Sequence, residues 1–136
     1  MRSQDLFRLY EEGYRDFTGI DLTGVDLSAR ILVGVNFSRS NLTGANLSRT
    51  FLTKANFTGT TLNRANLQFA KLSNACFTTA SLTKANLRGA FGVRANFSQA
   101  SITAVASSSP APPSARTVRS IIYVSAFMPT GSKRMR

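Results

Sequence analysis

Large apolar residues recur every five positions along most of this chain. The row starts at Phe17 and runs to Ile102, and only Gly92 interrupts it. Every fourth member is a phenylalanine, so the phenylalanines themselves repeat every twenty residues, as Phe17, Phe37, Phe57, Phe77 and Phe97. A fixed period of this kind indicates a repeat architecture in which successive units stack on one another.

Each five-residue unit has the same internal order. A small or apolar residue lies two positions before the large one, and from Ala65 to Ala100 it is always alanine. A polar residue, usually Asn or Asp, lies between the two. In an extended backbone the small and large residues point to one side and the polar residue to the other. Ser, Thr, Gly or a basic residue follows, and because the first three favour bends, we expect the chain to turn every five residues.

The two periods together predict a four-sided coil. Four bends return the chain to its starting point one layer further on, with Phe stacked along one inner wall and Leu along the other three. The unit resembles the Ala-Asn/Asp-Leu-X-X consensus of the pentapeptide-repeat family, from about Arg15 to Ala104. The resemblance implies an all-β fold, namely a right-handed quadrilateral parallel β-helix, or solenoid.

The two ends of the chain lack the repeat. Residues 3–13 predict a short helix with Ser3 as N-cap and Gly13 as its stop. Its resemblance to caps in the family implies that it covers the open end of the solenoid. We therefore divide the chain into an N-terminal capping helix (1–14), a pentapeptide-repeat β-helix (15–104), and a Pro/Ser linker with a basic tail (105–136) that we expect to be disordered.

One side of the coil departs from the polar rule. On the Phe side and on the side opposite, the middle residues are Asn or Asp, which can bond to the bends and to each other. Cys76 stands in one such position, and we interpret it as a replacement for Asn rather than a reactive thiol. The fourth side carries Ile31, Phe51, Lys71 and Phe91 in the middle, outward positions. The candidate interaction face comprises Ile31, Val33, Phe51, Lys54, Lys71, Phe91, Val93 and Arg94.

A contiguous apolar stripe usually marks an interaction surface, here for a protein partner or a second copy. Two alternatives stay open: the tail of the chain covers the stripe, or the deviations are simply tolerated. Arg30 lies on the same side at a position predicted to point inward. It either snorkels outward or pairs with an N-terminal carboxylate.

The chain is strongly basic, with 17 Lys and Arg against 6 Asp and Glu and a formal net charge of +11. All six acids lie at or before Asp26. Nucleic acid, an anionic membrane surface and an acidic protein are all permitted partners. Support for nucleic acid is weak, because the bases are spread over all four sides. Some family members mimic duplex DNA, bind a type II topoisomerase and have acidic rods; the positive charge argues against that mechanism here.

Nothing in the sequence indicates catalysis or a cofactor. Histidine is absent and Cys76 is the single cysteine, so neither an internal disulfide nor an ordinary His/Cys metal site is available. Phosphate-binding Gly motifs and nucleophile elbows are missing. No stretch approaches eighteen apolar residues and no signal segment is recognisable, so we expect a cytoplasmic protein without a transmembrane segment.

Two functions follow from these observations. The first is a non-catalytic protein-interaction scaffold, which binds an unidentified protein partner through the candidate interaction face or forms a homodimer through the open C-terminal end of the coil. The alternative is an electrostatic binder of nucleic acid or anionic membrane that uses the basic tail together with Arg49, Lys54, Arg64, Lys84, Arg88 and Arg94.

Overall fold

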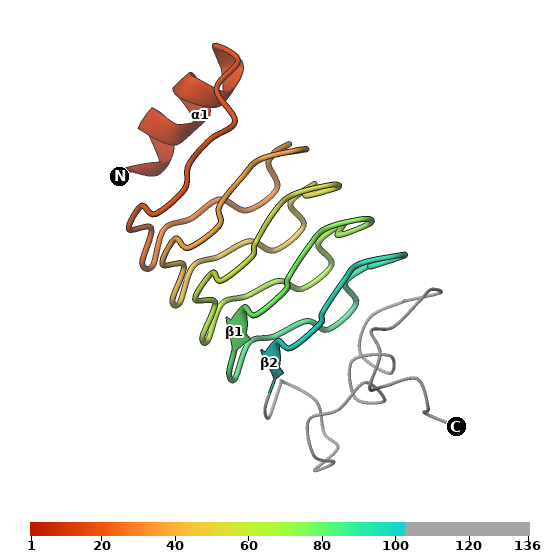
Figure 1. Cartoon of the computed structure of the whole chain (residues 1–136). Coiled ribbons are helices and arrows are strands. Elements are labelled where there is room, and N and C mark those ends of the chain that lie inside the picture. Colours follow the sequence, from red (N-terminus) through yellow and green to blue (C-terminus); the bar gives the residue numbers. More distant parts are fainter. Residues whose placement is uncertain (103–136) are drawn as a thin grey trace, which may run out of the picture.

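The computed structural model describes residues 1–102 as a stack of coils with one helix at the N-terminal end (Figure 1). The named elements are helix α1 (Ser3–Glu11) and two short parallel strands, β1 (Ser81–Leu82) and β2 (Ser101–Ile102). The predicted linker and tail, and the predicted dimer contact beyond Ile102, lie outside the described residues. No helix within residues 1–102 has the length and apolar character needed to cross a lipid bilayer.

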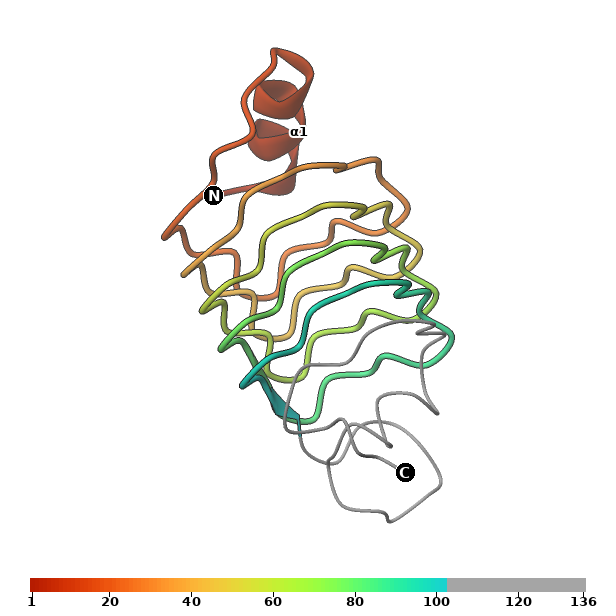
Figure 2. The ribbon, with the colours of Figure 1, turned by 45° about the vertical axis from the view of Figure 1, so that its right-hand side comes forward.

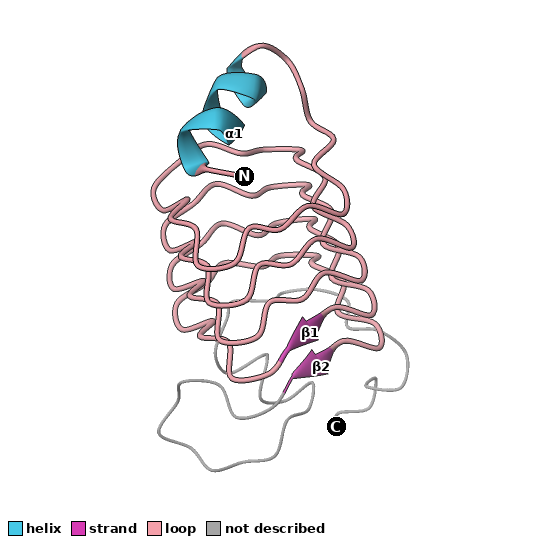
Figure 3. Ribbon diagram, turned by 90° about the vertical axis from the view of Figure 1, so that its left-hand side faces the viewer, coloured by secondary structure: helices cyan, strands magenta, loops and turns pink. Residues whose placement is uncertain are grey.

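Each coil contains twenty residues, because residues twenty apart in the sequence pair as parallel β-bridges. Asn36, for example, pairs with Asp16 in the preceding coil and with Asn56 in the following one. Four such pairing positions recur in every coil, and Figures 2 and 3 show the coils in a regular stack. Most pairings involve a single residue, because the next bend begins before the extended segment can lengthen.

Units in the middle of the stack bond their backbone groups in a repeating way. Around Phe37, the Phe37 N–H donates to the carbonyl of Asn56 at 2.8 Å, and the Asn56 N–H donates to the carbonyl of Val35 at 2.9 Å. The Ser40 N–H then closes the bend on the Phe37 carbonyl at 3.0 Å. The second bend residue, Arg39, has a φ of 57°, as a type II turn requires. Glycine is therefore not essential for the bend, and most bends place another residue there.

The interior is the predicted apolar ladder. All five ladder phenylalanines are buried, and neighbouring ring centroids lie between 4.7 Å and 6.1 Å apart. The first two pairs are tilted, at 44° and 39°, while the last two are stacked at 5°. The leucines of the other three sides are buried as well. The sequence prediction of Phe on one inner wall and Leu on three is confirmed.

Three buried hydroxyl residues replace alanine at the small position in the earlier coils. The Oγ of Ser40 donates to the Phe17 carbonyl at 2.6 Å. Thr50 and Thr60 do the same with the carbonyls of the preceding coil, each at 2.8 Å. Since a buried hydroxyl without a partner is costly, these bonds explain how the narrow interior accepts polar residues.

Helix α1 lies across the first coil (Figure 3). Leu6 is fully buried within the same apolar cluster as the first coil. The ammonium group of Met1 donates to the carbonyl of Asp21 at 3.2 Å, and the Tyr10 hydroxyl donates to the carbonyl of Val33 at 2.8 Å. The N-terminal segment thus supplies partners to two carbonyl groups of the first coil, those of Asp21 and Val33.

The helix predicted over residues 3–13 spans Ser3–Glu11, so it ends two residues earlier than predicted. The N-cap prediction was wrong: Arg2 occupies the N-cap position with extended dihedrals and no side-chain cap bond, and Ser3 is the first helical residue. The stop at Gly13 is confirmed, with a φ of 105° and an N–H that donates to the Tyr10 carbonyl. The Tyr14 N–H donates to the Leu9 carbonyl, which completes a Schellman motif.

Candidate interaction surface

The outward residues of the fourth side form a continuous row. Ile31, Phe51, Lys71 and Phe91 pair with one another in that order, so their side chains lie on adjacent coils. Ile31 is 64% exposed, Phe51 is 45% exposed and Phe91 is 43% exposed. Lys71 is exposed too, and its Nζ lies 5.9 Å from the centroid of the Phe51 ring, in a cation–π contact.

The remaining residues of the candidate interaction face flank this row. Val33 is 37% exposed, whereas Val93 is half-buried. Lys54 and Arg94 lie in the bends that follow, with φ values of 64° and 61°. The Arg94 Nε donates to Asn74 Oδ1 at 3.1 Å. The structure therefore brings the eight predicted residues onto one side and its adjoining corner.

The positive charge of this face is not neutralised within the described part of the chain. Salt bridges within residues 1–102 are confined to α1 and its N-cap, where Asp5 contacts Arg8 and Arg2. Within residues 1–102, the cations of the face, including Lys71, therefore form no salt bridge.

Sequence reasoning missed Phe69, which extends the aromatic surface to the corner before Lys71. Phe69 is 44% exposed with a φ of 59°. Its ring lies over Gly89 of the next coil, so close that a Cβ added there would meet a ring carbon at 2.5 Å. The Arg49 guanidinium lies 5.1 Å from the same ring. The sequence could have identified Phe69 by its position, because no other bend in the repeat has an aromatic residue as its second residue.

The inward position predicted for Arg30 is wrong. Its side chain is exposed, and its guanidinium carbon lies 4.0 Å from the centroid of the Phe7 ring in α1. The equivalent positions of later coils hold Thr50 and Ala70, which fit the interior that a long cation cannot share. At the first coil no preceding coil blocks the way, so Arg30 turns outward, the first of its two predicted alternatives.

Cys76 occupies an asparagine position, as predicted. Its Sγ lies 3.2 Å from Thr78 Oγ1 and 3.3 Å from Thr58 Oγ1. Asn56, one coil earlier, accepts from the Thr58 N–H and hydroxyl in a similar way. Burial alone would raise the pKa of the Cys76 thiol, but hydrogen bonds from Thr58 and Thr78 outweigh it and leave the pKa lowered.

The asparagine ladder bonds to its own bends. Asn36 Oδ1 accepts from the Ser38 N–H at 2.9 Å and from the Ser38 hydroxyl at 2.8 Å. The expected bonds between stacked Asn or Asp side chains do not occur within residues 1–102. The same part of the chain contains no group of three or more His, Cys, Asp or Glu side chains that could hold a metal ion.

The twenty-residue parallel coils, the buried Phe and Leu ladders and the positive-φ bends define a pentapeptide solenoid. The sequence model described as Pentapeptide repeats matches residues 20–59, 40–78 and 75–105, with eight copies. These matches span well over half of the chain, which therefore belongs to the pentapeptide-repeat family. No curated protein sequence matches the chain.

Two solved structures illustrate the likeness. HetL, a pentapeptide repeat protein involved in heterocyst differentiation regulation from the cyanobacterium Nostoc sp. strain PCC 7120, aligns with a TM-score of 0.76 and 27% identity over 77% of this chain. The alignment spans only 44% of HetL. Another pentapeptide repeat protein from Nostoc PCC 7120 aligns with a TM-score of 0.59 and 24% identity over 90% of this chain and 95% of its own. The second likeness concerns the fold alone.

Proposed function

We propose that this protein is a non-catalytic interaction scaffold that presents the candidate interaction face to a protein partner. The observation that supports the proposal most strongly is the exposed row Ile31, Phe51, Lys71 and Phe91 on four adjacent coils. Because every coil is hydrogen-bonded to its neighbours, the row is held rigidly and loses little conformational entropy on binding.

The chemistry of the face defines the kind of partner. The face combines aromatic and aliphatic side chains with cations and carries no acid. The apolar side chains of a suitable partner segment would bury the aromatic and aliphatic side chains of the face, and its carboxylates would pair with the cations. Phe69 enlarges the apolar part at the corner. We therefore propose an acidic, partly apolar protein surface as the ligand.

The architecture we infer for this scaffold is the right-handed quadrilateral parallel β-helix of the family, over residues 15–104, with residues 1–14 as its cap. The burial of Leu6 in α1 supports the capping role. HetL is involved in regulation of differentiation, and this supports a binding role for the shared solenoid. The comparison supplies the class of role and no partner.

An affinity experiment on the full-length chain tests the proposal. The test variant is Phe51→Asn with Phe91→Asn; asparagine suits these positions because it fills the same outward position on other sides. The matched control, Thr61→Asn with Ser81→Asn, introduces the same residue at the middle positions of a different side and removes no aromatic ring. We expect a protein from nuclease-treated native lysate to be retained by the wild type and the control and lost from the test variant.

The salt dependence of retention separates this proposal from the electrostatic alternative. Binding through the apolar row should persist at about 1 M salt, where the screening length falls to about 3 Å. Equal retention by the test variant and the control would refute the role of the face. Retention that disappears from all three proteins with salt or nuclease would favour an electrostatic binder.

A further inference from the structure

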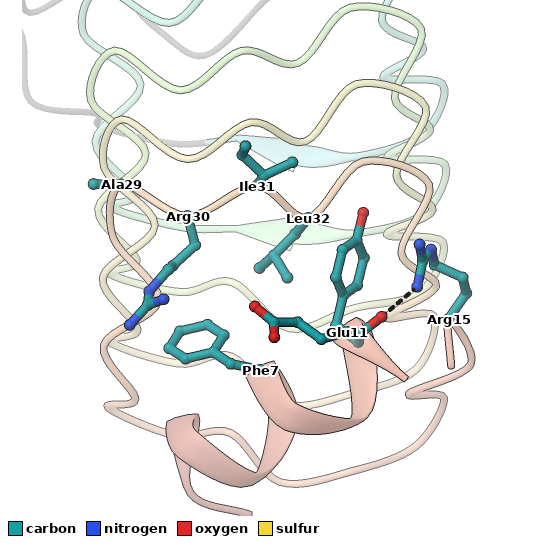
Figure 4. A pocket seen from close by; sticks show the side chains of 8 residues that line it. Phe7, Glu11, Arg15, Ala29, Arg30, Ile31 and Leu32 are labelled. Carbon is teal, nitrogen blue, oxygen red and sulfur yellow. Dashed lines mark hydrogen bonds between the residues drawn. The ribbon is translucent and has the colours of Figure 1, made fainter. Parts of the chain in front are cut away.

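A groove of about 600 Å³ lies between α1 and the fourth side of the first coil (Figure 4). Its lining comes from Phe7, Tyr10 and Glu11 of the helix, from Arg15, and from residues 29–32 of the coil. Counting back one coil of twenty residues from Ile31 gives residue 11, which lies in the last turn of α1 and not in a coil. The groove therefore occupies the place where a preceding coil would run. Within residues 1–102, no extended segment occupies this position of the solenoid register.

The coil side of the groove has an unpaired backbone edge. In the next coil, the Phe51 N–H donates to the Arg30 carbonyl and the Phe51 carbonyl accepts from the Leu32 N–H, both at 2.8 Å. The backbone N–H and carbonyl of an outward residue on the fourth side thus both point toward the preceding coil. Within residues 1–102, neither the N–H nor the carbonyl of Ile31 has a hydrogen-bond partner. Further along the same edge, the Val33 carbonyl accepts a hydrogen bond from the Tyr10 hydroxyl.

Two arginines flank this edge and are held by aromatic rings. The Arg30 guanidinium lies 4.0 Å from the Phe7 ring centroid, and that of Arg15 lies 3.7 Å from the Tyr10 ring centroid. Arg15 also donates to the Tyr10 carbonyl at 2.8 Å. Neither forms a salt bridge within the described residues, and the one acidic side chain in the lining is Glu11, which lies beside Phe7 in Figure 4. The groove thus favours an anionic occupant.

We propose that this groove binds an extended acidic peptide segment of a partner protein. The segment adds to the Ile31 edge as a parallel strand, in the register by which Phe51 pairs with Ile31 from the other side, and places a carboxylate beside Arg30. The chain cannot supply the ligand from its own C-terminal part, because no acid follows Asp26. This site does not depend on Phe51 or Phe91 side chains, so it stands apart from the proposed function.

Fluorescence anisotropy with the full-length chain provides the first test. The probe is a labelled, end-blocked peptide of sequence Val-Asp-Val-Asp-Val. One control peptide replaces both Asp by Asn. A second carries an N-methyl group on the central residue, which removes that backbone donor and so blocks strand pairing along one edge of the peptide. We expect each control to bind about tenfold more weakly or worse, the effect of about 1.4 kcal/mol.

Matched variants of the chain test the same binding event. Arg30→Gln should weaken binding of the acidic peptide about tenfold, the loss expected for one charge-assisted hydrogen bond. Glu11→Gln should strengthen it, because a like charge leaves the groove. Phe51→Asn with Phe91→Asn should leave it unchanged. All these side chains are exposed, so the fold is retained, which circular dichroism verifies.

Amide hydrogen exchange at Ile31 supplies a readout independent of charge. In the free protein the Ile31 amide should exchange fast and the Phe51 amide slowly, because only the latter donates to a backbone carbonyl. The acidic peptide should slow exchange at Ile31. Absence of binding, equal affinity for the three peptides, or unchanged exchange at Ile31 in the bound state would each overturn the proposal.

Discussion

Replacing Phe57 by alanine probes the phenylalanine ladder where it is most enclosed. The side chain is fully buried, and its ring centroid lies 5.7 Å from that of Phe37 and 4.7 Å from that of Phe77. Hydrogen bonds tie each coil to both neighbours, so the backbone cannot collapse into the cavity. A buried Phe→Ala change costs about 3–5 kcal/mol. The two ring contacts, about 0.5–1.5 kcal/mol each, place Phe57 in the upper part of that range.

Urea denaturation followed by circular dichroism measures this loss of unfolding free energy. Phe57→Leu is the matched control, because leucine fills the equivalent inner position on the other three sides, and it should cost about 1–1.5 kcal/mol. We expect the alanine variant to lose at least twice as much. An alanine variant with the wild-type midpoint, or with the midpoint of the leucine variant, would show that the ladder does not carry the stability of the stack.

Two further predictions concern the bends and the first coil. Gly89→Ala and Gly44→Ala both place alanine at a positive φ, of 71° and 68°, at a cost of about 1–2 kcal/mol. Only the Gly89 variant also meets the Phe69 ring, so it should melt lower than the Gly44 variant, and Phe69→Ala should abolish the difference; equal melting of the two variants would contradict the contact. Hydrogen bonds from the hydroxyl and N–H two residues onward lower the pKa of three aspartates of the first coil, Asp16, Asp21 and Asp26. Because their folded pKa lies below the unfolded value of about 3.9, this stabilisation is complete above that pH and is lost as the pH falls through the folded pKa. Thermal midpoints should therefore drop below about pH 4, and should drop less when all three are asparagine; an identical drop in both proteins would refute the assignment.

The repeat could be predicted well because its sequence period and its packing period are the same. The large residues in the row from Phe17 to Ile102 are buried, including both of these end members. The interruption at Gly92 changes nothing in the register, since Lys71 still pairs with Phe91 on that side. A closed coil allows one inward and one outward set of positions, so the residue pattern leaves little choice of arrangement.

The departures from prediction occur where contacts between distant residues replace the local pattern. Arg30 turns outward because the first coil has no predecessor and because Phe7, 23 residues earlier, offers a ring. Ser3 does not cap α1, since Arg2 already occupies that position. Phe69 was not predicted as part of the surface, because the alternation of inward and outward positions does not say where the side chain of a bend residue points. Its side chain lies instead along the stack, over Gly89.

The fourth side carries outward apolar residues that the pairing of the coils does not require. Its outward residues pair with the same backbone geometry as the polar row of the preceding side: the Phe51 N–H donates to Arg30 and the Asn46 N–H to Val25, both at 2.8 Å. An aromatic residue in place of asparagine therefore leaves the coil intact, but it gives up the side-chain bond to the bend and exposes apolar surface to water. Both changes are unfavourable for the isolated protein. These changes recur on one side, at Ile31, Phe51 and Phe91, and burial against the partner that we propose would offset the cost of the exposed apolar surface.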